Sequence, residues 1–144
     1  MNATEINSTL NRLRIIHTRS FAAYLYYAAP WIRKGFHGAA DVLTLMGSEL
    51  ERIADQLGEM ILNNGGEIIP GEFPIEFTGL HDLSADYLLG IIIDHQEKDI
   101  AVIQDCVNQL EADPLAQALA EESLGAAKGH LDSLQELVAT QSDA

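Results

Sequence analysis

Residues 66–84 read GEIIPGEFPIEFTGLHDLS, and this stretch decides how the rest of the chain is arranged. It contains Pro70 and Pro74, and its apolar residues do not recur at helical spacing. Proline removes a backbone hydrogen-bond donor and interrupts regular structure. We therefore expect a long irregular connection between the two halves of the chain.

Two helical segments precede this connection. Apolar residues recur at three- and four-residue spacing, which predicts helices over about 9–33 and 38–63. Pro30 is expected to kink or end the first helix. The run Asn63-Asn64-Gly65-Gly66 is expected to end the second, because Asn and Gly accept the left-handed conformation of a helix C-terminus.

Two further helical segments follow the connection, over about 84–112 and 114–138. Ser84, with Asp86 close behind it, is a candidate N-cap for the third helix. Asp113 and Pro114 supply an N-cap and a first-turn proline for the fourth helix.

The lengths of the links between these segments predict the topology. Short links make each pair of helices an antiparallel hairpin, and the long connection joins the hairpins. This is the arrangement of a ferritin-like four-helix bundle rather than of a simple up-down-up-down bundle. The sequence thus predicts an all-α fold with one domain over residues 1–144.

The composition limits the classes of partner. The formal net charge is −14, with 22 acidic and 8 basic residues, which argues against nucleic-acid binding. No segment has the apolar length of a membrane span. A single cysteine, Cys106, and the lack of a secretory signal predict a cytoplasmic protein.

Four stretches together resemble the ferritin-like superfamily, close to bacterioferritins and Dps-type miniferritins. They are HTRSFAAYLYYAAPW at 17–31, ELERIADQLGEMILNNGG at 49–66, DHQEKDIAVIQDCV at 94–107 and GHLDSLQEL at 129–137. The resemblance implies iron handling or protection against oxidative stress. Members of that superfamily usually bind two irons between the helices, with carboxylates and Glu-x-x-His pairs as ligands.

Carrying the superfamily's ligands onto this chain gives an incomplete di-iron site. Three ligand positions hold apolar residues, namely Leu50, Ile53 and Ala127. The remaining candidates for a reduced intra-bundle site are His17, His130 and one helix-three carboxylate, Asp94 or Glu97. Two imidazoles and a carboxylate suit one iron(II), and zinc could substitute for it. Alternatively, both histidines are hydrogen-bonded core residues.

A second interpretation moves the metal to a subunit interface, as in Dps-type proteins. Asp55 and Glu59 share a helix face, and so do His37 and Asp41, because residues four apart lie one above the other. Asp55 and Glu59 could equally belong to a solvated acidic face.

A third interpretation is a ferritin-like structural or oligomerising module that no longer binds metal. The resemblance implies a homo-oligomer, either a dimer or a Dps-sized cage, because no fifth helix follows the fourth. The haem-binding methionine would fall at Glu51, so haem is not expected. The resemblance leaves ferroxidase activity open, although the conventional di-iron ligands are largely missing.

Overall fold

The computed structural model describes residues 1–28, 37–79 and 85–142 of the chain. These residues form α1 (Ala3–Arg19), α2 (Phe21–Ala28), α3 (His37–Asn63), a 3₁₀ helix η1 (Ile75–Gly79), α4 (Ala85–Gln109) and α5 (Pro114–Ser142). No strand occurs within the described ranges. The prediction of an all-helical chain is therefore confirmed.

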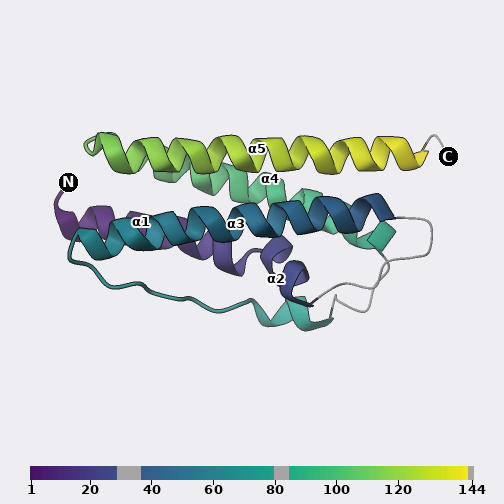
Figure 1. The fold of residues 1–144 in the computed structure, drawn as a ribbon, viewed down its shortest axis with the longest axis horizontal. Helices are drawn as coiled ribbons and strands as arrows, with labels where there is room; N and C mark the ends of the chain where they lie inside the picture. Colours follow the sequence, from purple (N-terminus) through teal and green to yellow (C-terminus); the bar gives the residue numbers. More distant parts are fainter. Residues whose placement is uncertain (29–36, 80–84, 143–144) are drawn as a thin grey trace.

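The four long helices lie side by side as an elongated bundle (Figure 1). In that view α1 and α5 run in one direction, and α3 and α4 run in the opposite direction. Residues 64–74 return along the outside of the bundle, as the irregular stretch in the sequence predicted. Helix α1 packs against α3 and α4, and α5 also packs against α3 and α4.

The first helix differs from the prediction of a single helix over 9–33. It starts earlier, at Ala3, because Asn2 and Glu5 form a capping box: the Asn2 side chain accepts from the Glu5 N–H at 2.9 Å. It is also interrupted at Ser20, whose backbone is extended at φ −70° and ψ 166°. The Ser20 hydroxyl then accepts from the Ala23 N–H at 3.2 Å and caps α2. Pro30 lies outside the described residues.

The other helix boundaries follow the sequence signals closely. Gly65 adopts φ +78° two residues after the last residue of α3, a conformation that glycine favours at helix C-termini. The Asp113 carboxylate accepts from the Ala116 N–H at 3.2 Å, which confirms the predicted N-cap of α5. Helix α4 ends at Gln109 rather than near 112, and α5 continues past 138 to Ser142. Ser84 is not among the described residues.

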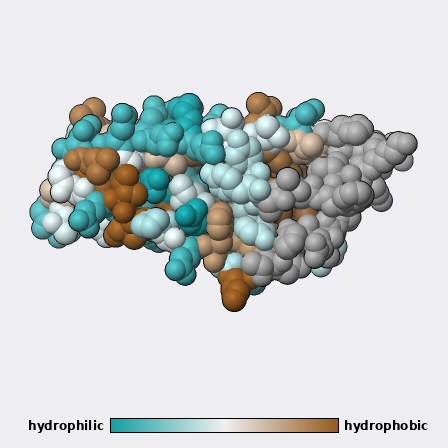
Figure 2. Space-filling view, turned by 60° about the horizontal axis from the view of Figure 1, so that its bottom comes forward, coloured by the Kyte–Doolittle hydropathy of each residue, from teal (hydrophilic) through white to brown (hydrophobic). Residues whose placement is uncertain are grey.

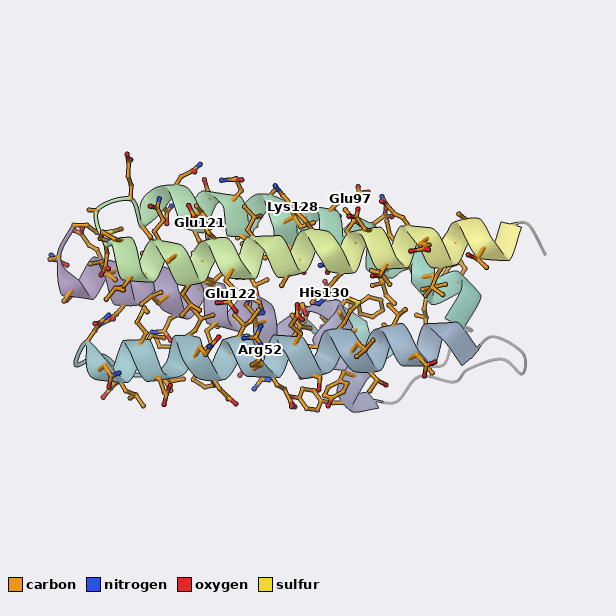
Figure 3. All side chains as sticks on the ribbon, turned by 45° about the horizontal axis from the view of Figure 1, so that its top comes forward. Arg52, Glu97, Glu121, Glu122, Lys128 and His130 are labelled. Carbon is orange, nitrogen blue, oxygen red and sulfur yellow. The ribbon has the colours of Figure 1, made fainter. Side chains whose placement is uncertain are left out.

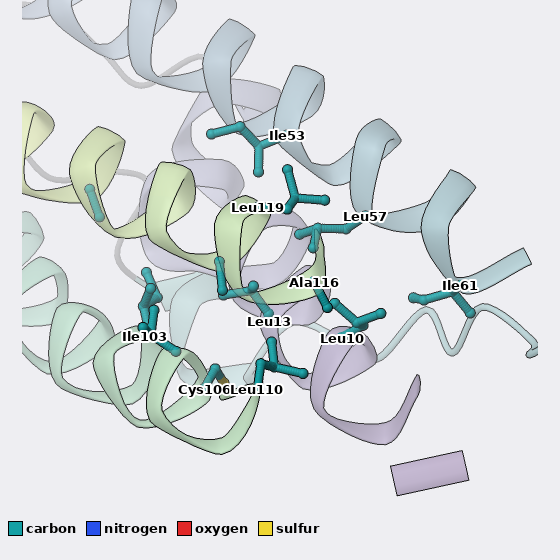
Figure 4. Packing of buried hydrophobic residues seen from close by; sticks show 13 residues of the cluster. Leu10, Leu13, Ile53, Leu57, Ile61, Ile103, Cys106, Leu110, Ala116 and Leu119 are labelled. Atoms are coloured by element: carbon teal, nitrogen blue, oxygen red, sulfur yellow. The ribbon is translucent and has the colours of Figure 1, made fainter. Parts of the chain in front are cut away.

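The buried apolar side chains form two clusters along the bundle. All four long helices contribute to the first, the α1 cluster, which Figure 4 shows around Leu10, Leu13, Ile53, Leu57, Ile61, Ile103, Cys106, Leu110, Ala116 and Leu119. The second, the α2 cluster, comprises Phe21, Ala22, Leu25, Leu43, Met46, Phe77, Leu88, Leu89, Ile92 and Leu134. Each fully buried leucine or isoleucine contributes about 1.5–3 kcal/mol of hydrophobic stabilisation.

The 3₁₀ helix η1 anchors the outer connection, because its Phe77 is buried in the α2 cluster. On the face that carries the connection, hydrophobic residues form separate patches among hydrophilic ones (Figure 2). Among the described helices, none is long and apolar enough to cross a membrane.

Candidate functional site

A small cavity lies where the α1 cluster and the α2 cluster meet. Its volume is about 10 Å³, which is room for about one water molecule or one ion. Side chains from all four long helices and from the break at Ser20 line it: Ile16, His17, Ser20, Leu50, Gln96, Asp99, Ile103, Ala127 and His130. The cavity therefore brings together polar residues that are far apart in the sequence.

His17, on α1, is the most deeply buried titratable residue of this cavity, with 2% of its surface exposed. Its Nε2 shares a hydrogen bond with the Ser123 hydroxyl on α5, and Ser123 is itself fully buried. Its Nδ1 is buried without a hydrogen-bond partner among the described residues. Burial, and to a lesser degree the nearby His130, lowers the pKa of His17 to about 4. The ring is therefore neutral at pH 7.

His130, on α5, reaches from α5 toward α3 (Figure 3). Its Nε2 lies 3.1 Å from Oε1 of Glu49 on α3. Burial lowers the pKa of His130, although the Glu49 carboxylate acts in the opposite direction. Its Nδ1 is also buried, and nothing in the described part of the chain hydrogen-bonds to it.

The contact with Glu49 determines the tautomer of a neutral His130. A carboxylate can only accept a hydrogen bond, so Nε2 must carry the proton and donate it. Nδ1 then keeps its lone pair. A carboxylate that holds the far nitrogen of a histidine in this way is the usual support of a metal-ligating imidazole. The Ser123 hydroxyl can either donate or accept, so it leaves both tautomers of His17 open.

Helix α4 contributes Gln96 and Asp99 to the cavity. The Gln96 side-chain amide donates to the Ala127 carbonyl at 3.0 Å, which ties α4 to α5 beside the cavity. Asp99 is the carboxylate of α4 that lines the cavity, and burial raises its pKa to about 6. In its ionised form, a weakly solvated carboxylate in such a place is a candidate metal ligand or proton acceptor.

The two carboxylates predicted as ligands from the third helical segment, Asp94 and Glu97, lie on α4 and do not line this cavity. Both are exposed, and Figure 3 shows Glu97 on the outer side of the bundle. The reason is the helical repeat of about 100° per residue, which places Gln96 and Asp99 on one side of α4 and Asp94 on the opposite side. The stripe Ile92, Gln96, Asp99, Ile103 carries this signal in the sequence.

Two of the three positions expected to have lost ligands lie at this cavity. Leu50 and Ala127 line the cavity, and Ile53 is fully buried in the α1 cluster. The structure thus places His17, His130, Leu50 and Ala127 around one cavity. Sequence reasoning missed Ser123 and Glu49 as partners of the two histidines, and Gln96 and Asp99 as residues that line the cavity.

The residues of the predicted interface site lie elsewhere. Asp55 and Glu59 are exposed and line a surface groove of about 490 Å³ together with Arg14 and Arg52. Asp41 is exposed and does not line this groove, and the side chain of His37 lies outside the described residues. Within the described chain, no group of three or more His, Cys, Asp and Glu side chains is already arranged to hold a metal ion.

The chemistry that the cavity permits is limited by its size. The His17–Ser123 pair has the residue types of a base and a nucleophile. However, both residues are buried, and a cavity of about 10 Å³ has no room for an organic substrate. Binding of one small ion or one water molecule is the chemistry that fits.

Comparison with known proteins found no matching family model, no similar curated protein and no similar solved structure.

Proposed function

We propose that this chain is a ferritin-like helical protein that binds one divalent cation, iron(II) with zinc(II) as a substitute, between His17 and His130. One observation carries the proposal. Two buried imidazoles from different helices line the same ion-sized cavity, and the Nδ1 atom of each has no hydrogen-bond partner among the described residues. A buried polar atom left unpaired costs about 1–3 kcal/mol, so such a pair favours an additional ligand.

The order and connection of the helices support the ferritin-like part of the proposal. Two contiguous helical hairpins, α1–α3 and α4–α5, are joined by a connection that returns along the bundle (Figure 1). Ligand sites of such bundles are built from inward-facing side chains on facing helices. The cavity has this location, with one histidine on each hairpin.

Asp99 is the carboxylate we propose as the third ligand. It lines the cavity from α4, and the same burial that raises its pKa also favours a positive ion beside it. Two imidazoles and one carboxylate suit iron(II) and zinc(II), both of which accept nitrogen and oxygen donors. Bound there, such an ion would supply a charge that satisfies both imidazoles and the carboxylate.

Equilibrium dialysis with cobalt(II) or zinc(II), followed by elemental analysis, tests the proposal. Wild-type protein should bind about one ion per chain. His17→Gln and His130→Gln should each weaken binding by at least tenfold, and Glu49→Gln by about 10–100-fold, since it supports a ligand. His95→Gln is the matched control, because His95 contacts Phe21 and Phe77 and does not line the cavity.

The outcome that contradicts the proposal is a wild-type protein that binds no ion, or binding that all three variants leave unchanged. Asp55→Asn distinguishes the interface interpretation, because Asp55 lies in the surface groove of α3 and not at the cavity. If only Asp55→Asn weakens binding, the ion belongs to that groove.

The competing function is a structural module that does not bind metal. The observation in its favour is that Nε2 of each histidine already has a protein partner, Ser123 or Glu49. One buried water between the two Nδ1 atoms would then complete the cavity. If the chain is such a module, adding zinc(II) should leave its thermal stability unchanged. If it binds the ion, free zinc(II) at one hundred times the Kd should stabilise the folded protein by about 2.7 kcal/mol.

Homo-oligomerisation, as a dimer or a Dps-sized cage, is also part of this proposal. Among the described residues Tyr27 on α2 and Leu45 on α3 are exposed apolar side chains. Light scattering after size-exclusion chromatography measures the mass directly. A mass of one chain at micromolar concentration would contradict the oligomer without touching the cavity proposal.

A further inference from the structure

A second hollow adjoins the cavity on the side of the outer connection. It is a surface groove of about 260 Å³ between α1, the start of α2, residues 72–77 and α4. Ile16, Ser20 and Asp99 line both the groove and the cavity. These three residues therefore border both spaces.

The break between α1 and α2 lies at this border between the two spaces. At Ser20 the backbone is extended, so α1 ends beside the cavity and a small side chain stands where a helix would continue. The connection approaches closely here: a Cβ at Gly71, which has φ +65°, would lie 3.0 Å from the Ile15 side chain. Phe21, Phe77 and His95 contact one another with ring centroids 5.0–5.5 Å apart and form the far wall.

The groove is predominantly acidic. Glu72, Glu76 and Asp99 line it, against one permanently positive side chain, Arg19. The Arg19 guanidinium is engaged locally, with Nη1 donating to the Thr18 carbonyl at 3.1 Å and its centre 4.8 Å from the Phe73 ring. A concave surface of one charge sign raises the local concentration of counter-ions and their association rate.

We infer that divalent cations reach the cavity through this groove, and that Asp99, which borders both spaces, is the residue that receives them. This inference rests on the proposed function, because it assumes an ion between His17 and His130. His130, which also lines the cavity, is paired with Glu49, and the two side chains are 12% and 40% exposed.

A charge-neutralising test measures the rate of cobalt(II) binding by stopped-flow absorbance. Glu72→Gln with Glu76→Gln should slow association about 5–10-fold at low salt, and the difference should shrink at high salt. The dissociation rate should change by less than twofold. Asp55→Asn with Glu59→Gln is the matched control, because it makes the same charge change in the α3 groove and should leave both rates unaltered.

A blocking test uses the properties of the chain's single cysteine. Cys106 is fully buried and burial raises its pKa, so a maleimide will react selectively at an introduced Glu76→Cys. A bulky label there should slow association and dissociation of cobalt(II) by the same factor, about tenfold, and leave Kd unchanged. A label on Glu59→Cys should change neither rate.

The outcomes separate the inference from its premise. If wild-type protein takes up no cobalt(II) in dialysis, the cation site itself is wrong. If uptake depends on His17 and His130 but the labelled Glu76→Cys protein binds as fast as the labelled control, the groove is not the route. In that case ions pass the His130–Glu49 side instead.

Discussion

The α1 cluster and the cavity differ in the polarity of their inward-facing side chains, although the same four helices form both. In the α1 cluster, facing positions carry Leu, Ile and Ala (Figure 4). About one turn further along α1 and α5, the equivalent inward positions carry His17 and Ser123. The helical period alone therefore fixes which residues face inward, but not whether those positions are used for packing or for polar chemistry.

The largest expected loss of stability comes from a substitution in the apolar α1 cluster. Leu57 is fully buried in the α1 cluster, and Leu57→Ala should destabilise the protein by about 2–5 kcal/mol through lost burial and a residual cavity. Urea denaturation measures the loss. Leu62→Ala, on the same helix but 57% exposed, is the control and should change stability by less than about 0.5 kcal/mol.

In the cavity, His17 should make the stability of the protein depend on pH. The pKa of this ring is about 4 in the folded protein and 6.5 in the unfolded chain, so the unfolded chain binds the proton first. Stability should therefore fall as the pH drops from 6.5 to 4, by up to about 3 kcal/mol from this ring. His17→Gln should remove that part of the slope. Urea midpoints across this pH range give the comparison, and parallel curves for both proteins would contradict it.

Asp99 should act in the opposite direction. Its pKa is raised to about 6 from 3.8, so its charge opposes folding at pH 7 and this cost disappears as the pH falls below about 4. Without metal, Asp99→Asn should stabilise the protein at pH 7 by about 2 kcal/mol, and the gain should vanish near pH 4. Asp94→Asn is the control, since Asp94 is exposed on the same helix.

A smaller effect is expected at the turn that brings α4 and α5 together at the end of the α1 cluster. Asp113→Ala removes the carboxylate that caps the Ala116 N–H and should cost about 1 kcal/mol. Glu111→Ala, at an exposed position in the same turn, serves as the comparison. Equal thermal denaturation of the two variants would show that the cap does not contribute.

The smallest effect concerns an exposed pair between α3 and α5. Arg52 Nη1 lies 3.0 Å from Glu122 Oε1, with the side chains 51% and 46% exposed. A double-mutant cycle should give a coupling of less than about 0.5 kcal/mol, because solvent screens the charges. The His130–Glu49 pair joins the same helices with His130 largely buried, and its coupling should be larger.

The sequence predicted part of the fold because several helix ends have a local chemical signal. The glycine after α3 and the Asp113 cap of α5 are read from a few neighbouring residues. The break at Ser20 was not predicted, because α1 and α2 together keep a continuous apolar pattern across it. At this break η1 packs against the start of α2 through Phe77 and Phe21, a contact that no local pattern contains.

The candidate site was predictable only in part for a similar reason. His17 and His130 are conspicuous because histidines are rare on an apolar helix face. Asp99 was missed in favour of Asp94 and Glu97, since a one- or two-residue error in register rotates a side chain to another side of the helix. Glu49 and Ser123 pair with these histidines across helix interfaces, and such pairs depend on how the hairpins meet.

The connection along the outside of the bundle has a consequence for folding. Because each hairpin is contiguous in the chain, α1–α3 and α4–α5 can each form early from local contacts. The cavity needs both, as His17 and Leu50 come from the first hairpin and Asp99 and His130 from the second. The chemical environment of His17 is therefore a natural reporter of hairpin docking. Its ring resonances in NMR should keep the titration of an unfolded histidine until the two hairpins meet.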